Sequence, residues 1–307
     1  MKLAVPDMIS NSYFPAEAAI ELGFFRAEGL DVTLEMIFPV DKAYMALRDG
    51  TVDFVGGSAH SALAAFPQWE GVKLIWAQAQ VMYWFLVMHK DFAARRGDIG
   101  AVKGKSIGAA PWVDMGLRRL LIAAGIDLAR DSVTIAPVPG AAGAGVNFGL
   151  TAAKALEDRK IDGFWANGMG AEVAVRRGVG DVVLDVRRGD GPKGCFDYTM
   201  ASIATTDRLI EKSPEVAAAA VRAMVKTQNA LKKDVARAAD VGRKLFPPEQ
   251  AELIVELIRR DLPYYDATIS ESFVSGMNQF ARELGLLSGD VPYERVVAKQ
   301  FRQLWTA

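Results

Sequence analysis

The chain has 307 residues, of which 51% are hydrophobic and 24% charged, and its formal net charge is −1. This balance is typical of a globular protein and excludes a disordered chain. The near-zero charge gives no electrostatic reason to expect nucleic acid or an anionic membrane as a partner. At this length a single hydrophobic core usually stops growing, so two compact units are expected.

The first third of the chain alternates strand and helix patterns. Polar and apolar residues alternate over 30–37, which predicts a strand, and Asp41 is expected to cap the following helix, which ends at Gly50. The predicted order is strand 3–5, helix 15–25, strand 30–37, helix 41–50, strand 53–56, helix 59–66 and strand 72–78. This order is typical of a parallel sheet covered by helices.

A continuous apolar run over 83–88 is interpreted as a long strand that leaves the first lobe. A second α/β unit is predicted after it, with strand 105–109, helix 114–124, strand 133–138, helix 150–159, strand 162–165, helix 171–177 and strand 182–186. A glycine-rich turn at 189–194 then leads into a strand at 198–205, which is expected to return to the first lobe.

The last third is predicted to be helical, over 214–233, 248–261 and 269–284. The first of these helices has Ser213 at the N-cap and Pro214 at the first helical position. One α/β lobe is therefore interrupted by another. The prediction is lobe one over 1–86 and 197–307, with the C-terminal helices packed on it, and lobe two over 87–196. Two chain crossings make a hinge, and a ligand is expected between the lobes.

Catalytic and metal chemistry have little support in the composition. Cys195 is the one cysteine, and a lone cysteine is usually a small buried residue. The two histidines, His60 and His89, are too few and too distant for a metal set, so no metal, cofactor or catalytic residue is predicted. No apolar run is long enough to span a membrane. The segment Met1–Pro6 lacks the core of a signal peptide, so either the chain is cytoplasmic or a signal has been removed.

Four segments carry a family resemblance: 18–32 (AAIELGFFRAEGLDV), 46–54 (ALRDGTVDF), 102–108 (VKGKSIG) and 161–165 (IDGFW). In this order they resemble the periplasmic solute-binding proteins of the sulfonate, nitrate and taurine type, a group that includes the NMT1/THI5-like thiamine-pyrimidine binding proteins. The likeness covers most of residues 13–205, whereas the C-terminal helices resemble the family only in layout.

The resemblance implies a fold and a function. The implied fold is the α/β type II periplasmic-binding-protein fold, with two lobes joined by a two-crossing hinge. The implied function is that of a monomeric, non-enzymatic receptor that delivers a sulfonate, carboxylate, aromatic acid or thiamine-pyrimidine compound to an ABC permease in the inner membrane. It also implies a periplasmic or extracytoplasmic location, with the signal peptide removed.

Candidate ligand-binding residues follow from the rule that open α/β sheets bind ligands beyond the carboxyl ends of their strands. They are Ser10, Asn11, Tyr13, Lys42, Gly57, Ser58, Ala59, His60, Gln78, Gln80, Trp84, Trp112, Asp114, Asn147 and Asn167. Gly57, Ser58 and Ala59 are the preferred anchor, because small residues let backbone N–H groups approach a ligand, although Ser58 could equally be a plain N-cap. Tyr13, Trp84 and Trp112 could stack on a planar ligand or simply pack.

Two further features concern the kind of ligand. Lys42 is the only Lys or Arg among these candidate residues, so an oxyanion would depend on backbone N–H groups and helix dipoles. The glycine-rich segment 140–145 does not match the G-x-G-x-x-G spacing of a nucleotide site and is interpreted as a flexible cleft loop.

Two alternatives to the receptor remain. The first is an enzyme on the same fold, either a pyrimidine synthase, which would carry a cysteine-rich motif that one cysteine cannot supply, or a decarboxylase-like enzyme. Asp114 with His60 is the only titratable pair that such an enzyme could use. The second alternative is the effector-sensing domain of a regulator, for which the near-neutral charge and the lack of a helix-turn-helix pattern offer no support.

Overall fold

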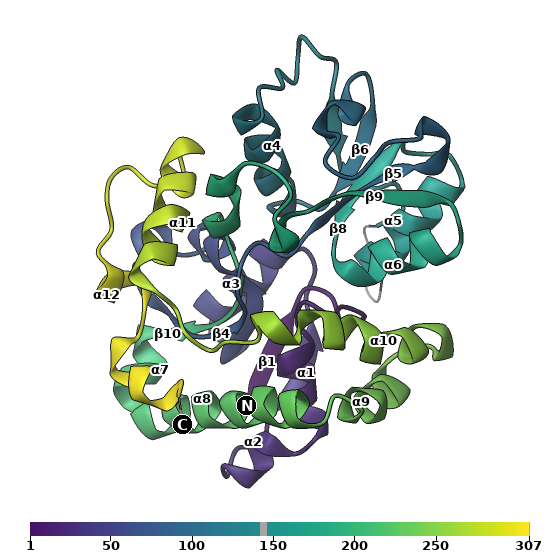
Figure 1. The fold of residues 1–307 in the computed structure, drawn as a ribbon. Coiled ribbons are helices and arrows are strands. Elements are labelled where there is room, and N and C mark those ends of the chain that lie inside the picture. The colour runs from purple at the N-terminus through teal and green to yellow at the C-terminus, as the bar shows by residue number, and fades with distance from the viewer. Residues whose placement is uncertain (142–145, 307) are drawn as a thin grey trace. The chain divides into compact units, whose positions relative to one another are not determined.

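The computed structural model describes residues 1–141 and 146–306 (Figure 1). It is a mixed α/β structure with two five-stranded sheets. The chain divides into two compact units: unit 1 contains Met1–Gln80 and Asp197–Ala307, and unit 2 contains Val81–Phe196.

The sheet of unit 1 has the order β2-β1-β3-β10-β4. Its strands are β1 (Lys2–Val5), β2 (Thr33–Met36), β3 (Phe54–Ser58), β4 (Val72–Ala79) and β10 (Ala201–Thr206). Strand β1 pairs in parallel with β2 and β3, whereas β10 lies antiparallel between β3 and β4. The parallel pairing predicted for this unit holds for β1, β2 and β3, and the returning strand β10 adds an antiparallel strand inside the sheet.

The N-terminal helices of unit 1 are shorter than the sequence predicts. They are α1 (Phe14–Glu21), α2 (Phe24–Ala27), α3 (Val40–Arg48) and the 3₁₀ helices η1 (Ala59–Ala64) and η2 (Pro67–Trp69). The predicted helix 15–25 is broken at Gly23, whose φ of 79° takes the backbone out of the right-handed helical region. The expected cap was also wrong: Pro39 occupies the N-cap of α3, and Asp41 lies in its first turn.

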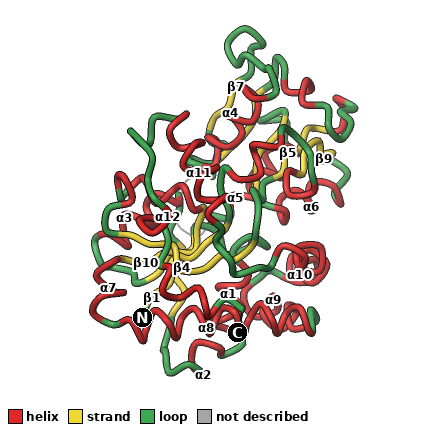
Figure 2. The backbone as a smooth tube through the Cα atoms, turned by 60° about the vertical axis from the view of Figure 1, so that its left-hand side comes forward, coloured by secondary structure: helices red, strands yellow, loops and turns green. Residues whose placement is uncertain are grey.

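The C-terminal part of unit 1 is helical. Its elements are α7 (Asp207–Lys212), α8 (Pro214–Lys233), α9 (Arg237–Leu245), α10 (Pro248–Asp261), η7 (Leu262–Tyr264), α11 (Glu271–Glu283), α12 (Tyr293–Val296) and η8 (Lys299–Leu304). Helices α8 and α10 begin and end where the sequence predicts, although the side chain of Ser213 makes no capping hydrogen bond. Helix α8 packs against α1 and α2, and α10 packs against α9 (Figures 1 and 2).

The sheet of unit 2 has the order β7-β6-β8-β5-β9. Its strands are β5 (Phe85–His89), β6 (Ser106–Ala109), β7 (Thr134–Ala136), β8 (Gly163–Ala166) and β9 (Gly180–Asp185), and its α-helices are α4 (Val113–Ala123), α5 (Phe148–Glu157) and α6 (Gly168–Arg176). Short 3₁₀ helices are η3 (Lys90–Phe92), η4 (Ile99–Val102), η5 (Val186–Arg188) and η6 (Lys193–Asp197). Strand β5 lies antiparallel between β8 and β9, and unit 2 begins at Val81.

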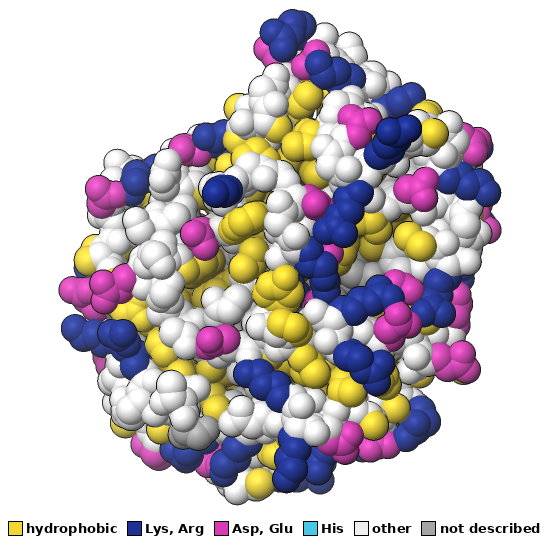
Figure 3. Space-filling model, in the orientation of Figure 1, with side chains coloured by type: hydrophobic (Ala, Val, Ile, Leu, Met, Phe, Trp, Pro, Cys, Tyr) yellow, Lys and Arg dark blue, Asp and Glu magenta, His cyan; other side chains and the backbone are white. Residues whose placement is uncertain are grey.

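Among the described residues, the exposed large apolar side chains are Met1, Ile122 and Val175. Figure 3 shows acidic and basic side chains interspersed on the face in view, and no histidine is visible there. Both histidines are buried, as is Cys195. Within the described part of the chain, no helix combines the length and the apolarity needed to cross a bilayer.

Candidate functional site

At the carboxyl edge of the unit 1 sheet, β3 ends in the segment that the sequence analysis preferred as an anchor. Gly57 and Ser58 close β3, and Ala59 and His60 begin η1; all four are buried. The Ser58 hydroxyl lies 2.6 Å from the Ser61 hydroxyl. The N–H of Ala59 donates to the Met200 carbonyl at 3.0 Å, so this backbone donor is used inside unit 1. Ser58 is therefore the polar side chain that this segment adds to the edge.

Two glutamines from the end of β4 also have partners inside unit 1. The Gln78 side chain accepts from the Ala16 N–H at 3.3 Å and donates to the Ser202 carbonyl at 3.3 Å. The Gln80 side chain donates to the carbonyls of Asp266 and Thr268 at 2.8 and 2.7 Å. Their amides thus connect the sheet to α1, β10 and the segment before α11, which is a structural role.

The loop between β1 and α1 is held by its own polar groups. The Ser10 hydroxyl accepts from the Ser12 N–H at 3.1 Å, and the Asn11 amide donates to the Asp261 carboxylate at 2.7 Å. Tyr13 is 5% exposed and occupies the N-cap position of α1. The Ser12 hydroxyl, in the same candidate loop, is buried and has no hydrogen-bond partner within the described residues. This loop therefore holds a polar group at the edge that a ligand could satisfy.

An aromatic cluster surrounds His60. The ring of His60 meets Phe280 edge-on at 5.4 Å, and Phe280 stacks on Tyr198 at 4.4 Å between ring centroids. Phe280 and Tyr198 were not predicted at this position, because Phe280 is 220 residues from His60 along the chain and no local pattern joins them. His60 is thus part of a packed cluster in unit 1. Lys42, by contrast, is exposed on α3.

A buried carboxyl in α1 was also missed. Glu17 is 0% exposed, and neither carboxyl oxygen has a hydrogen-bond partner within the described chain. Burial, and after it the negative charges of Asp7 and Glu21, raise the pKa of Glu17 well above its ordinary value. The sequence pattern does not predict that Glu17 is buried, because acidic residues commonly occur in the first turn of a helix, where they are usually exposed.

In unit 2, the carboxyl edge carries aromatic rings and a buried guanidinium. Trp84 is 3% exposed and its ring centroid lies 4.9 Å from that of Tyr83. Arg187 lies in η5, two residues after the end of β9; it is 6% exposed, and its guanidinium lies 5.8 Å from the Tyr83 ring centroid. The candidate loops of the sequence analysis did not include the turn after β9. Lys42 was therefore expected to be the only basic candidate, and Arg187 was omitted. The rule that ligands bind beyond the carboxyl ends of strands could have found Arg187, because it follows β9.

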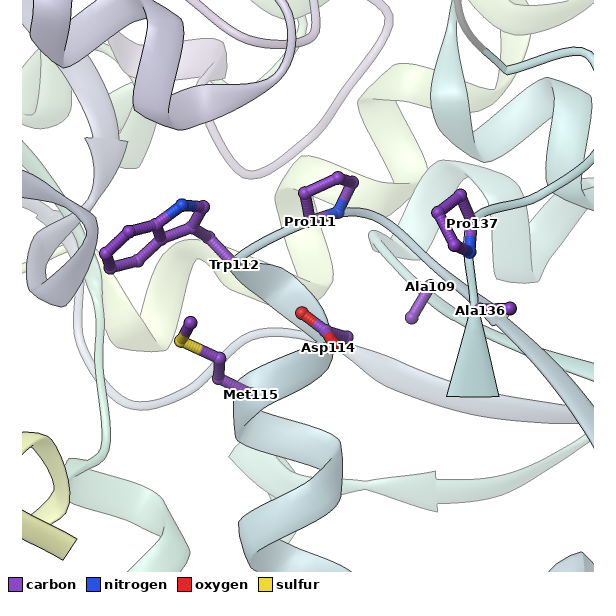
Figure 4. Close-up of a pocket in the computed structure, with 7 residues that line it drawn as sticks. All are labelled: Ala109, Pro111, Trp112, Asp114, Met115, Ala136 and Pro137. Atoms are coloured by element: carbon purple, nitrogen blue, oxygen red, sulfur yellow. The ribbon is translucent and has the colours of Figure 1, made fainter. Parts of the chain in front are cut away.

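Trp112 and Asp114 lie at a pocket of about 280 Å³ inside unit 2. Its lining residues come from the ends of β6 and β7 and the start of α4: Ala109, Pro111, Trp112, Asp114, Met115, Ala136 and Pro137 (Figure 4). The Asp114 carboxylate accepts from the Arg118 Nε at 2.8 Å, and the same guanidinium donates to the Ile135 carbonyl at 2.7 Å. The carboxylate is therefore held in place by β7 and α4.

Asn147 and Asn167 cap helices. The side-chain Oδ1 of Asn147 accepts from the Leu150 N–H at 2.8 Å at the start of α5, and the Oδ1 of Asn167 accepts from the Gly170 N–H at 3.1 Å at the start of α6. Both asparagines stand at the carboxyl edge, where capping accounts for their side-chain oxygens. The loop 140–145, expected to be flexible, falls largely on residues 142–145, which lie outside the described residues.

The described residues contain no group of three His, Cys, Asp or Glu side chains placed to hold a metal. His60 and Asp114, the titratable pair that an enzyme could use, have other partners. His60 packs on Phe280 in unit 1, and Asp114 pairs with Arg118 in unit 2. The two side chains thus have their contacts in different units.

Comparison with known sequences gives a family match. The sequence model described as "NMT1/THI5 like" matches residues 11–238. No curated protein matches the chain.

Solved structures share the fold over nearly the whole chain. The alkanesulfonate-binding protein SsuA of Xanthomonas axonopodis pv. citri, bound to MOPS, is 14% identical with a TM-score of 0.72, and the match covers 98% of this chain and 96% of that one. The periplasmic nitrate-binding protein NrtA of Synechocystis PCC 6803 is 13% identical with a TM-score of 0.72, covering 99% and 86%. The desulfurization enzyme DszB, in complex with biphenyl-2-sulfinic acid, is 13% identical with a TM-score of 0.66, covering 98% and 97%.

At such low identities these likenesses show the fold alone. They confirm the predicted periplasmic-binding-protein fold, with its two α/β units and C-terminal helices. Since binding proteins and an enzyme share this fold, the fold by itself does not separate binding from catalysis.

Proposed function

The chain belongs to the NMT1/THI5-like family, and from this we propose that it is the solute-binding receptor of an ABC importer. It binds a small organic solute and delivers it to a membrane permease. Structures that share the fold include an alkanesulfonate-binding and a nitrate-binding protein, which supports this proposal. The proposal includes an extracytoplasmic location and a monomeric state.

The observation that carries the proposal is the set of side chains at the carboxyl edge of each sheet. Unit 1 offers hydroxyl groups at Ser12 and Ser58, and unit 2 offers rings around a small pocket and a buried guanidinium at Arg187. Such sites, apolar with a few placed polar groups, bind and orient a small molecule.

The same residues give little support to an enzyme, although the DszB fold makes it the alternative to test. The one cysteine is fully buried, and His60 is packed against a phenylalanine ring. A nucleophile needs a neighbouring base and access to its substrate. We therefore propose that the chain is not an enzyme.

A thermal-shift screen tests the proposal. The purified chain is heated with sulfonates, carboxylates, aromatic acids and pyrimidines, and each solute that raises the Tm is recovered and analysed by mass spectrometry. A ligand at 100 times its Kd should stabilise the chain by about 2.7 kcal/mol, or about 4 °C in Tm at this length. Recovery of the solute unchanged supports a receptor. A chemically altered solute would establish an enzyme instead, and no shift with any solute would count against binding.

A further inference from the structure

The pocket at the start of α4 has the shape and lining of a ring site. Six of its seven lining residues are apolar, and three of them, Pro111, Trp112 and Pro137, carry rings. Figure 4 shows the Trp112 indole and Met115 on one side of the Asp114 carboxylate, with Ala109, Ala136 and Pro137 on the other. An engineered apolar cavity of about 150 Å³ accepts benzene, so a pocket of about 280 Å³ has room for one ring and its substituents.

The backbone at Trp112 is held in an unfavourable conformation. Its φ is 70° and its ψ is −36°, outside the regions that a bulky L-residue ordinarily occupies. Outliers of this kind persist where the surrounding structure requires them, and they cluster at ligand sites. Glycine would relieve the strain but supply no ring, so the presence of tryptophan here indicates a use for the indole.

Asp114 gives the pocket a hydrogen-bond acceptor without a strong net charge. Its Oδ2 accepts from Arg118, so the pair is close to neutral, while Oδ1 has no hydrogen-bond partner among the described residues. Small inorganic oxyanions gain nothing from an apolar pocket with a carboxylate in it. A ring with an N–H or O–H substituent, in contrast, can fill the pocket and donate to Oδ1.

We propose that this pocket selects solutes with an aromatic or heteroaromatic ring that bears a hydrogen-bond donor, and that Trp112 and Asp114 determine this specificity. The inference rests on the proposed receptor function and names the class of solute for it. It distinguishes this chain from neighbours whose ligands are nitrate or an alkanesulfonate.

Isothermal titration calorimetry on the full chain tests the proposal with four probes. 4-Aminobenzoate has a ring and a donor, 4-methylbenzoate has a ring of the same shape without a donor, and ethanesulfonate and nitrate have no ring. The parent chain should bind 4-aminobenzoate most tightly. Trp112→Ala should weaken both ring probes at least tenfold, and Asp114→Asn should weaken 4-aminobenzoate several-fold while leaving 4-methylbenzoate nearly unchanged.

Two control variants separate specificity from folding. Ser132→Gly relieves a positive φ of 52° at an exposed position outside the pocket, and Glu172→Gln removes a carboxylate from another i,i+4 pair of unit 2. Both should bind the ring probes as the parent does. Trp112→Gly should keep or raise the Tm while losing affinity, which a purely structural tryptophan would not do.

The outcomes distinguish the two proposals. If ethanesulfonate or nitrate binds better than the ring probes, or if Trp112→Ala leaves their Kd unchanged, the ring inference is wrong and the receptor function stands. If none of the four probes binds, the ring inference is overturned, and the broader thermal-shift screen decides the receptor function separately.

Discussion

At the scale of single residues, two carboxyls of unit 1, the buried Glu17 and the half-buried Glu28, have opposite electrostatic surroundings. Glu17 is fully buried without a hydrogen-bond partner among the described residues, and burial followed by the charge of Asp7 raises its pKa. Burial alone would also raise the pKa of Glu28, but hydrogen bonds and charge from Lys226 and Arg222 lower it overall. The folded chain therefore holds the proton of Glu17 and releases that of Glu28.

These shifts predict opposite pH dependences for two variants. A raised folded-state pKa contributes stability below the unfolded pKa, about 4.3, and that stability is lost as the pH rises through the folded pKa. Glu17→Gln cannot ionise, so its Tm relative to the parent should rise by at least about 2 °C between pH 5 and pH 8.5.

Glu28→Gln is the matched comparison. A lowered folded-state pKa contributes stability above the unfolded pKa, which is lost as the pH falls through the folded pKa. This variant should be less stable than the parent at neutral pH and approach it in acid. Thermal unfolding monitored by circular dichroism across the pH range measures both. If the Tm of Glu17→Gln and the Tm of the parent change in parallel with pH, the pKa of Glu17 is not raised in the folded chain.

At the scale of elements, a pair of glycines lets α5 and α6 approach closely. A Cβ on Gly170 would lie 2.7 Å from the carbonyl oxygen and 2.9 Å from the Cα of Gly149, both backbone atoms that cannot move aside easily. A Cβ on Gly149 would meet the Asn167 side chain at 3.0 Å. The two helix starts therefore touch through backbone, and the cap of α6 lies at this contact.

Gly170→Ala should lower the free energy of unfolding by about 1–3 kcal/mol, the usual cost of overpacking. Gly194→Ala is the control, because no atom lies within 4 Å of its Cβ position and its φ is not positive. It should change stability little. Urea unfolding measures both, and equal midpoints for Gly170→Ala and the parent would show that α5 and α6 are not in backbone contact.

At the scale of the whole molecule, charge limits the partners. The 36 Lys and Arg residues are balanced by 37 Asp and Glu residues, and the sequence pI is about 6.2. Polyanion binding depends on an excess of positive charge, since affinity comes from neutralised phosphates or sulfates. The molecule as a whole has no such excess at neutral pH.

The chain should therefore pass unretained through a heparin column at neutral pH and about 0.15 M salt. The same chain at a pH about one unit below its pI serves as the control, because protonated carboxylates leave a net positive charge that favours retention at low salt. Retention at neutral pH in 0.15 M salt would reveal a basic surface that the balanced charges conceal.

Much of the architecture was readable from local patterns. The bounds of α8 and α10 followed from Pro at the first helical position and from apolar periodicity, and the strand–helix alternation predicted two α/β units. Two of the candidate site residues also lie together in the structure. Trp112 and Asp114 were found by the rule that ligands bind at the carboxyl ends of strands, and the structure places both at one pocket.

The sequence by itself determined the family, the alternation of elements and the near-zero charge, because these depend on nearby residues or on composition. Only the tertiary structure decided the insertion of β10 between β3 and β4, the burial of Glu17 and Arg187, and the contact of His60 with Phe280. Each of these joins segments far apart in the chain or depends on which side chains cover a polar group. Such contacts are selected by the packing of the whole core, and no local pattern of residues encodes them.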